Sequence, residues 1–487
     1  MQTHILLLLD EHISGWMAAI SFAKLRQIKL TIIEQEQTST PANPIYTTNK
    51  HFSQWLTQSQ ITSSQWITAS QANFNLGTEF VDWNSRPDYQ RYLLPAISAT
   101  DKFYANQFID NINWRKQNFD SKTQPDNFFL SGYLAANNLA PVEPENFPFP
   151  VDFGYQFAQK PAVDYFRERL KDDNIHLQTQ QSVHPKQALI DAADLIFDCR
   201  QTHNLLAQQE SLNEPNSPIN TRKISISLAA SNDLRPVTQV TAKPNGVLKQ
   251  AASFDNQNIS FYFNQQACSV ETAEKELRQY VPSDAQITNV TDLNNKRLTN
   301  CWQDKLIALG PAYCANVPLD DADLTIESLL ISRFYELFQM PQLTPEQILR
   351  KRRKINLYAA YLAQEIADFN ALHYLLCDRQ DNNYWHLAKQ VSLSPVAERM
   401  IMAWQQNNKF PETYHNNNYH IYPLAAWYAL LAGNGFFPMP ARLKKSPSEA
   451  EQNSRQANEF FSQCSKNFGN NRQTIQDILN GQLNEQR

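Results

Sequence analysis

The sequence predicts an α/β fold that opens with a βαβ unit of the Rossmann type and ends in a mostly helical region. Two observations lead to this prediction. Near the N-terminus, two short, continuous apolar runs enclose a segment whose apolar residues recur at helical spacing. Beyond about residue 324, helical spacing of apolar residues recurs in segment after segment. The first pattern is typical of parallel strands joined by a crossover helix, and the second is typical of a helical layer.

The first elements follow one another at the spacing of a βαβ unit. Ile5–Leu9 is a continuous apolar run, which is typical of a strand buried on both faces. Ile13–Leu25 carries apolar residues at helical spacing, and Leu30–Ile33 predicts a second strand that closes on Glu34. Ala192–Cys199 predicts another buried strand of the same sheet.

The middle of the chain is rich in strands, and Lys223–Leu228 and Ile259–Phe263 are the clearest of them. Before them, prolines between residues 141 and 150 predict an extended loop. The helices that we expect afterwards are Leu324–Phe338, Pro345–Leu376, Pro395–Gln405, Pro423–Ala432 and two polar helices after Ser446.

The composition is that of a globular protein with a large core. The chain has 487 residues, of which 42% are hydrophobic and 19% charged, and this excludes disorder, collagen and a coiled coil. A formal net charge of −5 argues against a nucleic-acid partner, because such binders carry a basic excess. Only 10 of the 487 residues are glycine. This is far below the usual glycine content of about 7%. The backbone therefore has few places where it can closely approach a phosphate.

Cysteine usage and hydropathy bear on the compartment. The six cysteines form no CxxC pair, so neither a zinc site nor a disulfide framework is indicated, and we expect no metal. The apolar run Ile5–Leu9 is too short for a signal-peptide core or a membrane span. We expect a cytoplasmic protein with reduced thiols and no membrane partner.

The turn after the first strand departs from the pattern that a dinucleotide requires. A strand, a turn, a helix and a second strand ending in an acid form the layout of a dinucleotide-binding unit, whose turn needs G-x-G-x-x-G. Here only the third glycine, Gly15, is present, and Asp10 and His12 replace the first two. Glu34 stands where such units accept a ribose hydroxyl. The sequence therefore predicts the scaffold without its phosphate-binding turn.

The segment Gly15–Ala19, which reads GWMAA, resembles the flavin-dependent tryptophan halogenases, whose first turn typically reads GGGTAGWMAA. Further resemblances follow in the same order along the chain. They are NFNLG and FVDW within 73–83 (family FKLG and F.NW), GYQF at 154–157 (AYHFD), ADLIFDC at 193–199 (DADLVIDCSG), ALG and PLD within 308–320 (AIG and EPLEST), DFNALHY at 368–374 (DFIVLHY), and AAW at 425–427 with two later glycines (SW..VL.G.G). These collinear matches run from residue 5 to about residue 440.

The resemblance implies a fold, a cofactor and a substrate class. The fold is a flavin-monooxygenase-like dinucleotide domain with a mostly helical substrate region packed over it. We expect the dinucleotide domain, with inserted substrate-region segments, at residues 1–340 and a C-terminal helical cap at residues 341–487. The implied cofactor is FAD, and the implied substrate is tryptophan or an indole-like small molecule.

The residues that work in the family are replaced here. In the family, the amine of the FKLG lysine meets hypohalous acid, and the matching residue is Asn75, whose amide has no nucleophilic lone pair on nitrogen. The acid of EPLEST matches Asp320, a retained carboxylate with a shorter reach. Where the family holds halide with Ser-Thr-Gly, this chain has Asp321 and Asp323. Each like-charge pair at about 5 Å costs roughly 3 kcal/mol at an effective dielectric near 20.

Other flavin-binding segments are altered as well. The second one falls near Ala42–Thr48 without a glycine, and the third, DCSG in the family, reads DCRQ at Asp198–Gln201. The WxWxIP signature aligns with Val247–Ala252, where both tryptophans are missing. A pyrophosphate would also face the carboxylate of Asp10. FAD is thus implied by the resemblance, while these substitutions argue against its binding.

Three functional hypotheses follow. The leading one is a family member that has lost FAD-dependent halogenation and persists as a binding, regulatory or partner protein. The second is an active FAD-dependent halogenase or monooxygenase that acts on tryptophan or an indole-like substrate, with Asp320 as the acid and a lysine from elsewhere in the fold as the amine. The third is a subunit-like partner of an intact paralogue, and a homodimer is also compatible with the sequence.

Overall fold

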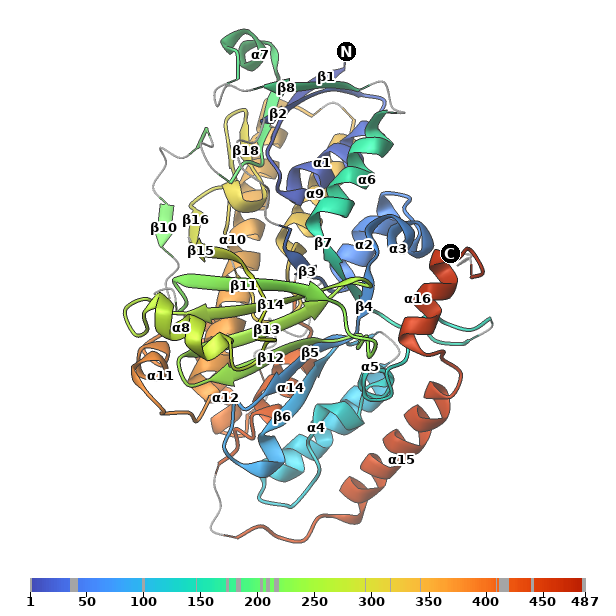
Figure 1. Ribbon diagram of the computed structural model, residues 1–487, viewed down its shortest axis with the longest axis vertical. Helices are drawn as coiled ribbons and strands as arrows, with labels where there is room; N and C mark the ends of the chain where they lie inside the picture. The colour runs from blue at the N-terminus through green and yellow to red at the C-terminus, as the bar shows by residue number, and fades with distance from the viewer. Residues whose placement is uncertain are drawn as a thin grey trace.

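A mostly parallel six-stranded sheet forms one end of the molecule in the computed structural model (Figure 1). The structure describes residues 2–35, 43–98, 101–145, 147–171, 175–180, 185–201, 205–206, 211–213, 219–293, 295–315, 317–341, 343–408, 410, 420–438 and 442–483. The order in this sheet is β17-β18-β9-β1-β2-β8, and only β17 and β18 pair antiparallel. Its strands are β1 (Thr3–Leu9), β2 (Ile28–Gln35), β8 (His176–Gln180), β9 (Leu195–Asp198), β17 (Trp302–Gln303) and β18 (Leu306–Ala308).

The predicted βαβ unit is confirmed. Strands β1 and β2 pair in parallel from Thr3 opposite Ile28 to Leu9 opposite Glu34, and α1 (Ile13–Ala23) connects them. All residues of β1 from Ile5 to Leu9 are buried, as the continuous apolar run requires of a central strand. Helix α1 packs against α6 (Gln159–Lys171) and α9 (Thr325–Phe338). The fold class is the predicted α/β arrangement with a Rossmann-type unit.

A second sheet of seven strands lies beside the first (Figure 1). Its order is β15-β11-β14-β13-β12-β5-β6, and all of its pairs are antiparallel except β12 with β5. The strands are β5 (Gly77–Val81), β6 (Arg91–Pro95), β11 (Arg222–Ala229), β12 (Thr238–Lys243), β13 (Gly246–Ala252), β14 (Asn256–Phe263) and β15 (Ile287–Asp292). Strands β11 and β14 confirm the two clearest strand predictions for the middle of the chain.

Two small sheets join the larger ones. The first consists of β3 (Ile45–Thr47), β7 (Gly154–Ala158) and β4 (Asn73–Asn75), and both of its pairs are antiparallel. The second pairs β10 (Ser211–Asn213) with β16 (Lys296–Leu298). The small β3-β7-β4 sheet is important for the site, because it carries both the second predicted flavin-binding segment and Asn75.

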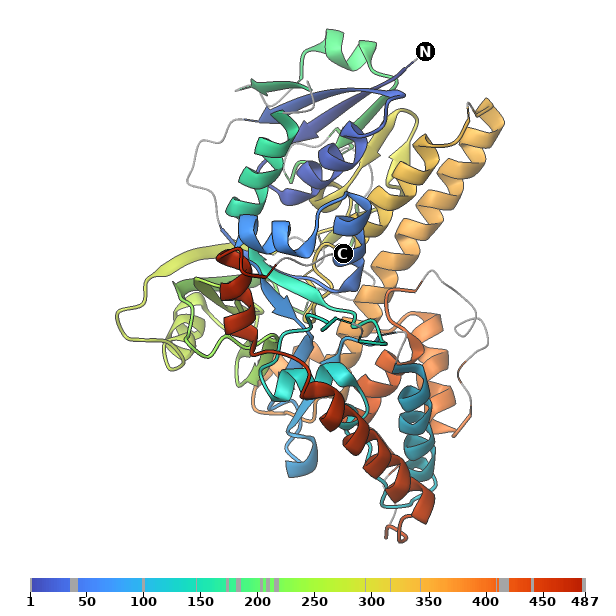
Figure 2. The same ribbon diagram turned by 90° about the vertical axis from the view of Figure 1, so that its right-hand side faces the viewer.

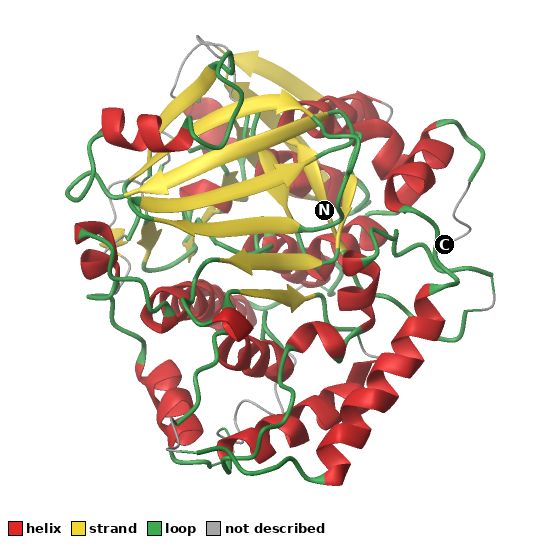
Figure 3. Cartoon of the chain, turned by 60° about the horizontal axis from the view of Figure 1, so that its bottom comes forward, coloured by secondary structure: helices red, strands yellow, loops and turns green. Residues whose placement is uncertain are grey.

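Helices make up most of the remainder, and in Figure 3 many of them lie below the strands while others flank the strands at the top. Besides α1, α6 and α9, they are α2 (Lys50–Gln58), α3 (Ser63–Ser70), α4 (Lys102–Lys116), α5 (Leu130–Ala136), α7 (Gln187–Ala192), α8 (Val270–Leu277), α10 (Pro345–Leu376), α11 (Asn383–Ala388), α12 (Pro395–Gln405), α14 (Leu424–Gly433), α15 (Ser448–Ser465) and α16 (Asn471–Leu479), with 3-10 turns at Pro87–Tyr89, Pro125–Asn127 and Gly310–Ala312. Helix α10 is the long diagonal rod in Figure 2. Helix α15 packs against α4 and α5, and α16 packs against α3.

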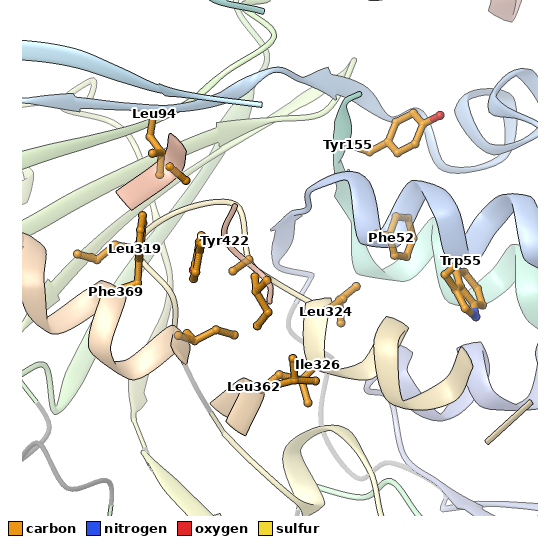
Figure 4. Packing of buried hydrophobic residues seen from close by; sticks show 14 of the residues in the cluster. Phe52, Trp55, Leu94, Tyr155, Leu319, Leu324, Ile326, Leu362, Phe369 and Tyr422 are labelled. Carbon is orange, nitrogen blue, oxygen red and sulfur yellow. The ribbon is translucent and has the colours of Figure 1, made fainter. Parts of the chain in front are cut away.

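A continuous apolar core joins the sheets to the helices. Figure 4 shows Phe52 and Trp55 of α2 at one end of this cluster and Phe369 and Tyr422 at the other. The rings of Phe369 and Tyr422 stack with centroids 3.8 Å apart. All six cysteines are buried, and none of them forms a disulfide bond. Among the helices that the structure describes, none has the length and apolar composition needed to cross a membrane.

Gly15 has the packing role that the third glycine of a dinucleotide turn requires. A Cβ at this position would lie 2.3 Å from Leu9 Cδ2 and 3.1 Å from Cys199 Cβ. Because Leu9 and Cys199 end the neighbouring strands β1 and β9, α1 can approach the sheet closely only through a glycine.

We expect Gly15→Ala to destabilise the protein by about 1–3 kcal/mol, since the added methyl overpacks a fully buried helix–sheet contact. Urea denaturation followed by circular dichroism measures this change. Ser462→Ala, on the exposed face of α15, is the control and should stay within about 0.5 kcal/mol of the wild type. Equal stability of both variants would contradict this account of Gly15.

Candidate functional site

A cleft of about 620 Å³ lies at the carboxyl edge of the parallel strands, where it also meets the seven-stranded sheet. This edge is where ligands bind in open α/β sheets. The cleft is lined by the turn after β1 (Glu11, His12), β3 and the residue before it (Pro44–Tyr46), β11 and β14 (Lys223, Tyr262), the segment 311–318, and the start of α9 (Asp323–Glu327).

The first turn is closed by its own side chains. Asp10 accepts hydrogen bonds from the backbone N–H groups of His12, at 2.8 Å, and Gln201, at 2.5 Å. The imidazole of His12 caps α1 by accepting from the N–H of Ser14 at 3.3 Å. Burial lowers the pKa of His12 to about 4, so this cap is neutral at physiological pH. The carboxylate of Asp10 thus takes N–H groups at the place where a dinucleotide turn offers them to a phosphate.

The third predicted flavin-binding segment is also closed. Asp198, at the end of β9, accepts hydrogen bonds from the Nε and Nη2 atoms of Arg200, at 2.9 Å and 2.8 Å. Both side chains are buried, so the guanidinium fills space beside the carboxyl edge of the sheet. Gln201, the next residue, gives its N–H to Asp10, and the first and third segments are thereby joined.

A second carboxylate joins the second segment to the start of α9. Asp323 Oδ2 accepts from the backbone N–H of Thr47, at 2.9 Å, and from the Thr47 hydroxyl, at 3.1 Å. Thr47 ends β3, which is the segment that the sequence analysis placed at the second flavin-binding turn. Lys249 Nζ lies 3.8 Å from the same oxygen of Asp323.

Lys249 is a functional candidate that the sequence analysis did not identify. It lies on β13, and its ammonium donates to the backbone carbonyls of Pro318, at 3.1 Å, and Asp320, at 3.0 Å. It therefore ties the loop before α9 to the seven-stranded sheet and offsets the charge of that loop's carboxylates. The available signal was a lysine inside the otherwise apolar and polar-neutral strand Gly246–Ala252.

Asn75 is fully buried and hydrogen-bonded on both sides of its amide. Its Nδ2 donates to the Thr48 carbonyl at 3.0 Å and reaches Asp321 Oδ2 at 3.4 Å. Its Oδ1 accepts from the hydroxyl of Thr238 at 3.4 Å. Burial and the neighbouring Asp320 charge raise the pKa of Asp321 well above its usual range. Asn75 therefore contacts the loop that carries Asp320 and Asp321.

Asp320 is completely buried beside Tyr422. Burial raises its pKa to about 6, and the nearby Tyr422 hydroxyl and Lys249 ammonium partly offset this effect. Its Oδ1 accepts from the N–H of Ala322 at 3.2 Å. Tyr422 in turn stacks on Phe369, and both rings are labelled in Figure 4. A buried acid of this kind can give or accept a proton near neutral pH.

Glu34 faces α6. Its Oε1 atom lies 2.5 Å from Arg167 Nη2, and the guanidinium of Arg167 lies 4.8 Å above the ring of Trp16. A ribose hydroxyl at this position would share the carboxylate with Arg167. Among the described residues, Glu34 makes no hydrogen bond or ion pair with Asp10, His12, Asn75 or Asp320.

Glu327 adds a further acid to the cleft, on the first turn of α9. Burial raises its pKa to about 7, and the nearby Asp323 carboxylate acts in the same direction. Burial raises the pKa of the Tyr46 phenol well above its usual range, and the charges of Asp323, Glu327 and Asp10 act in the same direction. The end of the cleft next to the first turn is consequently acidic. The described residues include no group of three or more His, Cys, Asp or Glu arranged to hold a metal ion.

Comparison with known proteins identifies the family. A family model described as tryptophan halogenase matches residues 12–448. The chain belongs to the tryptophan halogenase family. The 7-chloro-L-tryptophan 6-halogenase KtzR of Kutzneria sp. (strain 744) is similar to it, with 22% identity over 474 residues that cover 88% of this chain and 90% of KtzR.

Solved structures agree on the fold. The tryptophan halogenase from Shewanella frigidimarina NCIMB 400 superposes with a TM-score of 0.80 and 19% identity, over 99% of this chain and 98% of that one. Xcc4156, a flavin-dependent halogenase from Xanthomonas campestris, superposes with a TM-score of 0.78 and 17% identity, over 98% of each chain. The resemblance read from the sequence is therefore confirmed at the level of family and fold.

The family resemblance implies FAD as the cofactor. The residues of the first turn can therefore be compared with what an FAD pyrophosphate requires. The Asp10 carboxylate holds the N–H groups of His12 and Gln201, and the His12 side chain holds that of Ser14. A pyrophosphate at this turn would find those N–H groups taken and a carboxylate facing it. The residues of the turn do not fit an FAD pyrophosphate bound in the usual dinucleotide geometry.

Glu327 gives this halogenase-family site a pH dependence. A carboxyl group whose pKa is higher in the folded than in the unfolded state binds its proton more tightly in the folded state. The free energy of unfolding therefore falls as pH rises from the unfolded pKa to the folded pKa. For Glu327 this window runs from its ordinary pKa of 4.5 to about 7. We expect Glu327→Gln to gain on the order of 1–3 kcal/mol over the wild type at about pH 8, compared with about pH 5.

Urea denaturation of both proteins across this pH range measures the gain. Glu398→Gln, at an exposed position on α12, is the matched control and should run parallel to the wild type. A pH-independent difference between Glu327→Gln and the wild type would contradict the assignment.

The role of Lys249 can be tested in the same way. We expect Lys249→Met to lower the free energy of unfolding by about 2–4 kcal/mol, because two carbonyls and the Asp323 carboxylate lose a buried cation. Lys296→Met is the control, since Lys296 lines the same cleft from an exposed position and its ammonium forms no hydrogen bond or ion pair with a described residue. A loss no larger than that of Lys296→Met would show that Lys249 does not hold the loop.

Proposed function

We propose that this member of the tryptophan halogenase family does not carry out FAD-dependent halogenation and instead binds a small molecule in the cleft at the carboxyl edge of its parallel sheet. The observation that carries the proposal is the carboxylate of Asp10, which accepts from two backbone N–H groups at the first turn. This carboxylate supplies internally the negative charge that a phosphate would bring.

Electrostatics supports the proposal. A pyrophosphate at the first turn would approach Asp10, and its neighbours Asp323 and Glu327 lie at the same end of the cleft. Each unit like-charge pair at about 5 Å costs roughly 3 kcal/mol at an effective dielectric near 20, or about a hundredfold in affinity. Two cations near these carboxylates are already paired, Lys249 with Asp323 and Arg200 with Asp198.

The chemistry at position 75 supports it as well. The amide of Asn75 is locked between Thr48, Thr238 and Asp321, and it offers neither a positive charge nor a nucleophilic lone pair. The family's amine therefore has no counterpart at this position.

A specific observation favours a second candidate, an active FAD-dependent halogenase or monooxygenase that acts on tryptophan or an indole-like compound. Asp320 keeps a buried carboxyl group whose pKa is raised to about 6, which suits a proton transfer. The amine of Lys249 lies 3.0 Å from the carbonyl oxygen of the same residue. In this candidate Lys249 would replace the missing lysine, although its protons are already committed to two carbonyls. A subunit-like role beside an intact paralogue remains a third proposal, tested by co-purification.

Titration of the purified full-length protein with FAD, followed by flavin fluorescence, tests the proposed function. We expect no saturable binding in the micromolar range, because the first turn already holds its own carboxylate. A flavin-dependent relative such as Xcc4156 serves as the positive control. Stoichiometric micromolar binding to this chain would contradict the proposal.

Two further measurements sharpen the result. Incubation with FAD, a flavin reductase, NADH, halide and a panel of indoles should give neither halogenated nor hydroxylated products, and any enzyme-dependent product would favour the second candidate.

Asp10→Gly should raise FAD affinity by about a hundredfold if the carboxylate is the obstacle. Asp292→Asn, which removes a charge at the cleft rim without releasing N–H groups at the first turn, is the matched control.

A further inference from the structure

The cleft contains a buried cation without an anionic partner. Arg297 lines the cleft from β16 and is 91% buried, since its relative exposure is 9%. Its Nη1 donates to the carbonyl of Ala360 at 2.7 Å, while its Nε is buried without a hydrogen-bond partner. Arg297 has no carboxylate within ion-pair distance among the described residues.

The geometry of this guanidinium specifies how it would bind. With Nη1 held by a carbonyl on α10, the edge formed by Nε and Nη2 makes no bond to a described residue. This edge is the fork that pairs with the two oxygens of a carboxylate. A buried guanidinium whose Nε–Nη2 edge makes no hydrogen bonds costs free energy unless a ligand accepts those bonds.

A second cation lines the same cleft. The ammonium of Lys223, on β11, forms no hydrogen bond or ion pair with any described residue, and it lies 5.9 Å from the centre of the Tyr262 ring. Burial lowers the pKa of Lys223, and the charge of Asp323 acts in the opposite direction. Two cleft-lining cations thus have no ion-pair partner among the described residues.

The remaining lining narrows the choice of anion. The walls between these cations and α9 are largely apolar and include Pro311, Val317, Pro318, Ile326 and Ile366. Asp323 and Glu327 also line the cleft, and their charges would repel a dianion more strongly than a monoanion. The lining therefore favours a monoanion with an apolar body over phosphate.

We propose that the cleft binds a small organic monocarboxylate, whose carboxylate pairs with the Nε–Nη2 edge of Arg297 and is also attracted by Lys223, while its apolar body lies against the proline-rich wall. This inference rests on the proposed function, because it requires the cleft to be available to a ligand other than FAD. The inference adds to the proposed function the chemical class of the small molecule that the cleft binds.

Isothermal titration of the full-length protein tests the proposal with two pairs of probes, benzoate with benzamide and indole-3-carboxylate with its amide. Each pair has nearly the same shape and differs in charge. We expect at least one carboxylate to bind about tenfold or more tightly than its amide. Equal affinity within both pairs, or no binding of either carboxylate, would overturn the proposal, as would binding of inorganic phosphate in preference to both carboxylates.

Variants locate the site. Arg297→Gln should weaken carboxylate binding about tenfold and leave amide binding unchanged, and Lys223→Met should weaken it about threefold to tenfold. Lys296→Met, an exposed lysine of the same cleft, should change it less than about twofold. If Arg297→Gln does not fold, Lys223→Met and the wild-type probe pairs still decide the outcome. Unchanged carboxylate affinity in a folded Arg297→Gln or in Lys223→Met overturns the assignment.

The FAD titration separates the two levels of inference. Failure of both FAD and the carboxylates to bind would overturn the carboxylate assignment and leave the proposed loss of flavin dependence standing. Micromolar FAD binding that displaces the carboxylates would overturn the proposed function, while the charge preference of the Arg297 edge would stand on its own measurement.

Discussion

Backbone N–H groups at the carboxyl edge of a parallel sheet need an acceptor, and in this protein the chain's own carboxylates supply it. Asp10 accepts from the turn after β1 and from the turn after β9, and Asp323 accepts from the end of β3. These bonds join four separate segments of sequence in two pairs. In a dinucleotide-binding protein the N–H groups of the first turn would face the ligand, and here they are bonded within the chain.

Compensating cations make this arrangement tolerable. The sequence alone places several carboxylates close together and predicts that they repel one another. The structure adds Lys249, which lies between the loop before α9 and the seven-stranded sheet and offsets part of that repulsion. Arg200 has a similar effect on Asp198. The acids are consequently structural elements of the cleft wall, and their cost in repulsion is lower than a count of negative charges implies.

Much of the fold was predictable because the patterns that define it are local. Continuous apolar residues at Ile5–Leu9 specify a central strand, and Thr344 before Pro345 forms the N-terminal cap from which α10 begins at its predicted residue. The predicted helix Ile13–Leu25 ends two residues early, at Ala23. Helix α14 begins at Leu424, because Pro423 serves as its cap.

The site was predictable only in part, because its decisive contacts join residues far apart in sequence. The resemblance matched Asn75 and Asp320 to two separate family positions, and the structure places Asn75 against Asp321, the neighbour of Asp320. Nothing local in the sequence shows that Lys249 would reach a loop 71 residues away or that Arg297 would be buried without an anion. Glu34 was placed by spacing alone, and its pairing with Arg167 depends on how α6 packs.

The bond from Asp10 to Gln201 has a thermodynamic consequence. When a bound nucleotide accepts the hydrogen bonds of such an edge, it stabilises the folded state by mass action, so the melting temperature depends on the nucleotide concentration. Here the acceptor is the Asp10 side chain of the same polypeptide, so its effective concentration at the turn is always high. On the proposed function, the stability of this edge therefore does not depend on how much FAD is present.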